Sequence, residues 1–268
     1  MNAIKTADKY LAITRINLQN ALAYFWDVAY RSIFMVVIMY VFVRLWSVTY
    51  GAAGRATIAG YSLSDMIWYL VMAETIIIGK TRFIEKIGEE VKDGSLAYTM
   101  NRPYNYLLYH FFSGLGETVL RMAVTFVAGT VVTAWLVAPP TLSPLHLLPL
   151  LLTVALAIAL DFCISAILGL LAFFTEDVAS FQFIYQKVLF ILGGMMLPLD
   201  FFPAWLRNLS LALPFNLVVY APARLFVRFD WGQFGRVALM QTAWIAALAL
   251  ILALLYRYGI RRLSINGG

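Results

Sequence analysis

The stretch from Val237 to Tyr256 reads VALMQTAWIAALALILALLY and contains no charged residue, although Arg236 and Arg257 stand at its two ends. An α-helix rises about 1.5 Å per residue, so about 20 apolar residues cross the roughly 30 Å hydrocarbon core of a bilayer. The stretch therefore predicts a transmembrane helix.

The composition of the whole chain agrees with this prediction. Of its 268 residues, 62% are hydrophobic and 13% are charged, whereas soluble domains average about 45–50% apolar and about 25% charged. This balance disfavours a soluble enzyme, a disordered chain and a nucleic-acid-binding protein. The net charge of +6 is typical of a membrane protein, because Lys and Arg collect at the cytoplasmic ends of spanning helices.

Five further apolar stretches resemble the first, which brings the expected number of transmembrane helices to six. They cover Ser32–Tyr50, Met66–Gly79, Met122–Leu136, Leu147–Phe174 and Val178–Leu197. We therefore expect an all-α, polytopic membrane protein in which residues 1–268 form a single membrane domain.

Basic residues divide unevenly between the two sides of this arrangement. Eleven lie in the N-terminal tail, the segment after the second helix and the C-terminal tail, and five lie on the opposite side. Since cytoplasmic segments carry the excess of Lys and Arg, we expect both termini in the cytoplasm.

Two segments on the expected cytoplasmic side have helical patterns without spanning the membrane. The first 20 residues place apolar side chains among Lys and Arg, which predicts an amphipathic helix in the membrane interface. Within Lys80–Pro103, the residues Ile84, Ile87 and Val91 recur at helical spacing between charged residues, which predicts a short amphipathic helix. The pattern fits either a solvated connector or a contact for a cytosolic partner.

On the expected outer side, residues Gly193–Asp230 stay apolar and aromatic although prolines interrupt them. Pro198, Pro203 and Pro214 prevent a continuous spanning helix. Short interfacial or re-entrant helices, with their backbone groups satisfied against the bundle, are the expected solution.

No set of residues suited to catalysis or metal binding emerges. Two histidines and the single Cys163 are too few for a metal cluster or a Cys/His nucleophilic pair. Gly79-Lys80-Thr81 resembles the end of a phosphate-binding loop, but Glu74 stands where that loop requires glycine. We expect this chain to be neither an enzyme nor a cofactor-binding protein.

Charged residues at membrane depth are the remaining polar candidates, because each costs a few kcal/mol there unless protein or water surrounds it. Glu117 and Arg121 stand four residues apart on one helix and are expected to pair. Asp161 and Lys187 lie near the middle of consecutive helices and are candidates for a second pair. Together with Glu74 these charges either fix the helix packing or line a substrate path.

Several segments together resemble the ABC-2-type transporter permeases. The connector GEEVKDGSLAYTMNRPYNYLLY, residues 88–109, resembles the segment between the second and third helices of that family. The stretch GGMMLPLDFFPAWLRNLSLALPFNLVVYAPARL, residues 193–225, resembles their signature before the last span. The basic tail YRYGIRRLSINGG, residues 256–268, is similar to the C-terminal end of their free-standing six-helix members.

This resemblance implies the permease subunit of a bacterial ATP-driven exporter in the cell inner membrane. Such a subunit forms a dimer with itself or with a related permease, and separate cytosolic ATPase subunits bind the ATP and Mg. The resemblance makes the N-terminal helix an elbow helix. It also implies a coupling helix that contacts the ATPase, formed by Ile84, Ile87, Glu89, Glu90, Val91, Lys92 and Asp93. The same resemblance implies an outer gate that includes Pro198, Phe202, Pro203, Trp205 and Pro214.

Two other functions stay open on the sequence alone. A secondary transporter driven by an ion gradient typically shows broken helices at matching positions in both halves, whereas the proline-rich interruption here comes late in the chain. A non-transporting assembly subunit of the membrane is the third reading. An aromatic-rich bundle with few charges favours an amphipathic or hydrophobic cargo, moved out of the cytoplasm or the inner leaflet.

Overall fold

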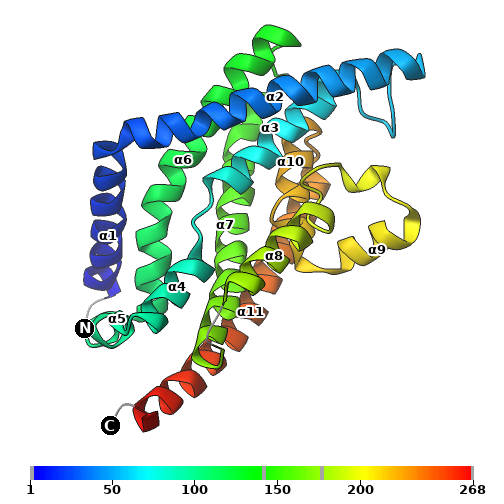
Figure 1. The fold of residues 1–268 in the computed structure, drawn as a ribbon. Coiled ribbons are helices and arrows are strands. Elements are labelled where there is room, and N and C mark those ends of the chain that lie inside the picture. Colours follow the sequence, from blue (N-terminus) through cyan, green and yellow to red (C-terminus); the bar gives the residue numbers. More distant parts are fainter. Residues whose placement is uncertain (1–2, 141–142, 176–177, 267–268) are drawn as a thin grey trace.

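The computed structural model describes residues 3–140, 143–175 and 178–266, and the regular secondary structure of this part is helical apart from one isolated bridge between Ile58 and Tyr61. Figure 1 shows the helices in chain order along the colour ramp. Their bounds are α1 Ala3–Ala23, α2 Phe25–Ala53, α3 Leu63–Gly79, α4 Phe83–Lys92, α5 Ser95–Met100, α6 Tyr106–Leu136, η1 Pro144–His146, α7 Leu147–Leu170, η2 Leu171–Phe173, α8 Ala179–Ile191, η3 Leu199–Phe201, α9 Ala204–Ala212, η4 Pro214–Leu217, α10 Tyr220–Val227 and α11 Trp231–Asn266.

Four of the described helices are long and apolar enough to cross a membrane. They cover Phe25–Ala53, Tyr106–Leu136, Pro144–Leu170 and Trp231–Gly259. Each overlaps one of the stretches that the sequence predicts to span, including the uncharged run near the C-terminus. The chain is therefore a membrane protein with several apolar helices.

The other two expected spans form shorter helices. α3 has 17 residues and α8 has 13, which correspond to about 26 Å and about 20 Å of helix. The expected span Val178–Leu197 ends early because the chain turns at Gly193 and Gly194, where Gly194 adopts a φ of +72°. Among the described residues, four of the six expected spans thus have the length and composition of a membrane-crossing helix.

α3 is the centre of the bundle. The residues from Met66 to Ile76 are buried, and α2, α6 and α10 pack around them. A helix that is apolar on all sides is expected to be covered on all sides. Ser62 and Asp65 begin α3 with a capping box, in which each side chain accepts a hydrogen bond from the other's backbone N–H at 3.1 Å.

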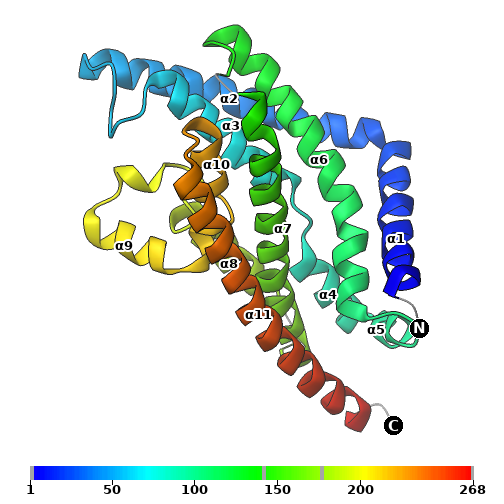
Figure 2. The ribbon, with the colours of Figure 1, turned by 180° about the vertical axis from the view of Figure 1, so that it is seen from behind.

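The remaining helices are arranged so that the molecule has two distinct ends. α1 meets α2 at a bend near Tyr24 and packs along α6, while α11 packs along α7. Both termini and α5 lie at one end in Figure 1 and in the reverse view of Figure 2. The far end of α2 lies towards the other end, and α9 lies to one side of the bundle at about half its height.

Candidate functional site

α4 is held on the bundle by the apolar residues along one side. Ile84 and Ile87 are fully buried, and Ile87 lies so close to Gly169 of α7 that a Cβ there would come within 3.1 Å of its side chain. Phe83 meets Phe162 of α7 edge-on, with ring centroids 4.8 Å apart. These contacts fix α4 across α7.

The opposite side of α4 presents charge to the surroundings. Glu89 is exposed, and so are Lys86, Lys92 and the following Asp93, while Val91 is half-buried. Of the expected coupling residues, Ile84 and Ile87 therefore face the bundle and anchor the helix. The exposed face consists of charged side chains.

Glu90 belongs to neither group, because its carboxylate turns towards α6. It accepts a hydrogen bond from the Tyr106 hydroxyl at 2.9 Å and lies 3.3 Å from Nε2 of His110. Burial raises the pKa of Glu90, whereas the interaction with His110 and the hydrogen bond from the Tyr106 hydroxyl lower it. The lowering effects are larger, so the pKa of Glu90 lies below its ordinary value. Glu90 thus ties the end of α4 to the start of α6.

The expected ion pair between Glu117 and Arg121 of α6 is present, and a third charged side chain joins it. Arg121 contacts the Glu117 carboxylate, and Lys86 from α4 approaches the other oxygen of the same carboxylate at 3.3 Å. One acidic side chain is therefore shared by two basic ones from different helices.

The second expected pair, between Asp161 and Lys187, is wrong. Asp161 is buried and instead accepts hydrogen bonds from Lys80 and from the Tyr185 hydroxyl, each at 2.7 Å. Lys187 follows Tyr185 by two positions in α8, which places it on the opposite face of the helix. It is exposed, with its ammonium 5.0 Å from the Phe183 ring centroid.

Glu74 is the most enclosed of the charged candidates. It lies within α3 and is 2% exposed, and within the described part of the chain no hydrogen bond or ion pair reaches its carboxylate. It lines neither of the two cavities that flank α4.

A cavity of about 730 Å³ lies between α2, α3, α4, α6 and α8. Charged side chains from α4 and α6 line one part of it, among them Lys86, Glu89, Glu117 and Arg121, and Lys187 joins them from α8. Apolar side chains line the rest, including Phe34, Ile77, Ile78, Leu189 and Phe190. Three of the expected intramembrane charges thus line a cavity, namely Glu117, Arg121 and Lys187. A role in lining a substrate path, one of the two alternatives for these charges, requires such a position.

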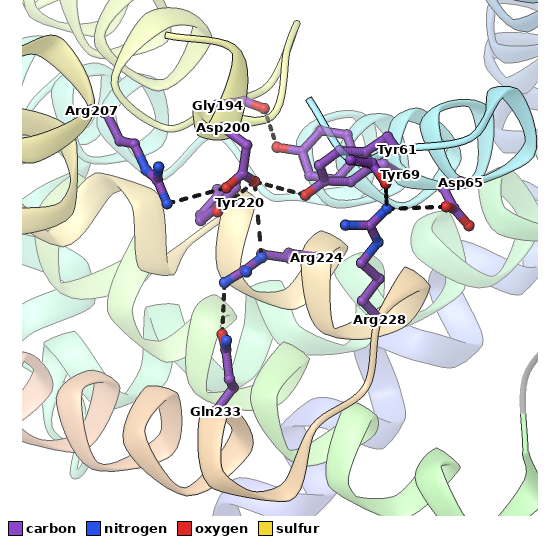
Figure 3. A network of polar contacts seen from close by, with 11 residues as sticks. Tyr61, Asp65, Tyr69, Gly194, Asp200, Arg207, Tyr220, Arg224, Arg228 and Gln233 are labelled. Carbon is purple, nitrogen blue, oxygen red and sulfur yellow. Dashed lines mark hydrogen bonds and ion pairs between the residues drawn. The ribbon is translucent and has the colours of Figure 1, made fainter. Parts of the chain in front are cut away.

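A polar network around Asp200 of η3 reaches α9 and α10 within the proline-rich segment and Tyr61 just before α3. The carboxylate accepts hydrogen bonds from the Tyr61 and Tyr220 hydroxyls, each at 2.9 Å. Arg207 of α9 lies 3.3 Å from it and Arg224 of α10 lies 3.9 Å from it. Figure 3 shows the side chains converging on Asp200 from these separate segments.

The network extends to the start of α3 through Arg228. Its guanidinium stacks over the Tyr61 ring at 4.3 Å from the centroid, contacts the backbone oxygen of Gly60 and lies 3.3 Å from Asp65. Burial and the neighbouring Asp200 carboxylate raise the pKa of Tyr61, so its hydroxyl remains a hydrogen-bond donor. Tyr69 donates to the backbone oxygen of Gly194 in the same region.

The expected gate residues border this network. Pro198 is buried just before η3, and Pro214 is buried at the start of η4. Pro203 precedes α9, and Trp205 of α9 is 70% exposed, while Phe202 is half-buried.

Sequence reasoning does not single out Asp200, Tyr61 or Arg224. Tyr61 and Asp200 are separated by 139 positions, and no periodicity relates residues at such a distance. An acidic residue within the apolar proline-rich segment is the signal that a search for buried polar groups would have used.

Several long apolar helices around a cavity lined in part by charged side chains are typical of a membrane transport protein. The sequence model of the family described as ABC-2 family transporter protein matches residues 33–267. The chain belongs to this family, as the resemblance of its connector, proline-rich segment and tail implies. A comparison with curated proteins finds no match.

Proposed function

We propose that this chain is the permease subunit of an ATP-driven exporter, with ATP hydrolysed by separate cytosolic subunits. The observation that carries the proposal is the arrangement of α4. Its buried apolar side packs on α7, its Glu90 is tied to α6, and its charged side is exposed. A partner that binds the charged side would move a helix that is coupled directly to two membrane helices.

The rest of the proposal assigns parts of the molecule to the two sides of the membrane. The end with both termini and α4 is cytoplasmic, and α9 with its neighbours lies on the outer side and forms the gate. α3 and α8 complete a six-helix arrangement across the inner membrane, with α9 and α10 as re-entrant helices and α1 as an interfacial elbow. A second permease, either the same chain or a related one, completes the path.

The cavity of about 730 Å³ supports an amphipathic cargo. It has a charged part beside α4 and an apolar part between α2, α3 and α8, and transported amphiphiles need both. Its position next to α4 would let movement of that helix change the shape of the cavity.

The test is purification of the tagged chain from native membranes in mild detergent, with the ATPase activity of the preparation as the readout. We expect co-purification of a nucleotide-hydrolysing subunit. The double reversal Glu89→Lys/Asp93→Lys should lower the co-purified activity by about tenfold, because like charges across a matched interface are strongly unfavourable.

The matched control is Asp8→Lys, which reverses an exposed acidic residue of α1 and leaves α4 unchanged. It should retain the activity of the unmodified chain. Full activity of the Glu89/Asp93 variant would contradict the coupling role of α4. Substrate flux that depends on an ion gradient without any ATPase would contradict the exporter and favour a secondary transporter.

A further inference from the structure

The cavity between α2, α3, α4, α6 and α8 has an excess of positive charge. Among the described residues, five basic side chains line it and three acidic ones do, namely Lys80, Arg82, Lys86, Arg121 and Lys187 against Glu85, Glu89 and Glu117. An excess of one sign of charge in a concave site attracts ions of the opposite sign.

Two of the basic side chains have an acidic partner of their own: Lys80 pairs with Asp161, which does not line the cavity, and Arg82 lies 3.5 Å from Glu85. The other three are not balanced in this way. Lys86 and Arg121 share the single carboxylate of Glu117. The Nε of Arg121 is buried and has no hydrogen-bond partner within the described part of the chain. A guanidinium has five N–H donors and no acceptor, so this side chain retains an unused donor beside the cavity.

Lys187 lacks an acidic partner altogether among residues 3–140, 143–175 and 178–266. Its ammonium lies 5.0 Å and 6.0 Å from the ring centroids of Phe183 and Phe190. An unpaired ammonium on an apolar helix of a membrane protein is costly. An anion bound in the cavity would offset that cost.

The remaining wall limits the kind of anion. Phe34, Ile77, Ile78 and Leu189 line the same cavity, and a small hydrated ion would leave them in contact with water. The volume of about 730 Å³ lies within the range of about 300–1,000 Å³ that is usual for sites that enclose an organic ligand. The site therefore suits a molecule with an anionic head and an apolar part.

We infer that this cavity binds the anionic head group of an amphipathic molecule, with Lys187 and Arg121 as its charge partners and the α2–α3 side chains against its apolar part. The inference rests on the proposed function only in naming this molecule as cargo. Binding itself requires neither ATP nor the partner subunit.

The test is equilibrium binding to the purified full-length chain in a non-ionic detergent, measured by microscale thermophoresis. The probes are dioctanoyl phosphatidic acid, dioctanoyl phosphatidylcholine and glycerol 3-phosphate. We expect the phosphatidic acid to bind most tightly, because only this probe has both the net anionic head and the chains. Lys187→Gln should weaken its binding by about tenfold, because a charge-assisted contact to phosphate is lost.

The control variant is Arg257→Gln, which removes an exposed basic residue of α11 that does not line the cavity. It should bind the phosphatidic acid like the unmodified chain. Arg121→Lys keeps a cation beside Glu117 but removes the Nε donor, and should give a smaller loss than Lys187→Gln. Because Lys187 forms no ion pair within the described residues, the Lys187→Gln variant should unfold at the same temperature as the unmodified chain.

Three results would overturn the inference. Equal affinity for the two lipids would show that the net charge of the head group plays no role. Unchanged binding of phosphatidic acid by the Lys187→Gln variant would show that Lys187 does not belong to the binding site. Glycerol 3-phosphate binding as tightly as the lipid would show a site for a free anion, without the apolar part. None of these results affects co-purification of an ATPase, so the failure of this inference is distinguishable from the failure of the exporter proposal.

Discussion

Asp200 accepts hydrogen bonds from Tyr61 and Tyr220 and lies within ion-pair distance of Arg207 and Arg224. Its side chain is 15% exposed, so its hydrogen bonds form largely out of contact with solvent. A buried carboxylate needs such partners to offset the loss of water. This one side chain therefore connects η3 both to the residues just before α3 and to α10.

Asp200→Ala should loosen that segment. The Tyr61 and Tyr220 hydroxyls would lose their acceptor, and each buried group left without a partner costs about 1–3 kcal/mol of unfolding free energy. We expect a lower unfolding temperature and faster amide hydrogen exchange across η3, α9 and α10, measured by mass spectrometry in detergent. Asn208→Ala, at an exposed position of α9, is the control and should exchange like the unmodified chain. Unchanged exchange in the Asp200 variant would show that the network does not hold the segment.

Charge pairs were predictable only where the partners are close in the sequence. Glu117 and Arg121 are four positions apart, and helix geometry alone places them together. Asp161 has partners on two other helices, and their choice depends on how α3 and α8 pack against α7. The assignment of Lys187 as its partner failed because helical phase puts that side chain on the opposite face from Tyr185.

At the level of helices, the contact between α1 and α6 depends on one small residue. A Cβ on Gly116 would come within 2.5 Å of the backbone oxygen of Thr14 and 2.8 Å of the backbone nitrogen of Leu18. Both are backbone atoms of α1, which cannot move aside without displacing the helix. Next to this contact, the Thr14 hydroxyl donates to the backbone oxygen of Phe112 at 2.9 Å.

Gly116→Ala should therefore separate α1 from α6. Overpacking of this kind costs about 1–3 kcal/mol, and we expect a lower unfolding temperature with faster proteolysis of α1. Gly51→Ala is the matched control, because a Cβ there has no atom within 4 Å. That change replaces glycine by the better helix former and should leave stability equal or slightly higher. An equal response of the two variants would contradict a close contact between α1 and α6.

The existence of the helices was predictable, but their ends were less so. Apolar runs identify where α2, α6, α7 and α11 lie. The length of α8 depends on the turn at Gly193 and Gly194, where Tyr220 donates its backbone N–H to the oxygen of Gly193 at 3.0 Å. That contact comes from a residue far along the chain, so local hydropathy extends the helix beyond its actual end.

For the molecule as a whole, the transport proposal requires α4 and α9 to face opposite sides of the membrane. Lys92 is exposed at the end of α4, and Trp205 is 70% exposed on α9. The single native Cys163 is buried, and its replacement by alanine gives a background for labelling.

Cysteine labelling in intact cells checks this arrangement. Trp205→Cys should react with a membrane-impermeant maleimide added outside, whereas Lys92→Cys should react only after the membrane is opened. Arg257→Cys, on the C-terminal part of α11, should behave like Lys92→Cys. Labelling of both α4 and α9 from the same side would refute the proposed orientation.

The sequence by itself determined that this is a helical membrane protein, where its long helices lie, that a short amphipathic helix follows α3, and which family the chain resembles. These properties depend on apolar runs, helical spacing and residue order, which are local. Only the tertiary structure decided that Ile84 and Ile87 face inward, that Asp161 pairs with Lys80, that Asp200 gathers its partners, and that an excess of basic side chains lines one cavity. Each of these depends on which helix faces which, and packing between distant segments sets that choice.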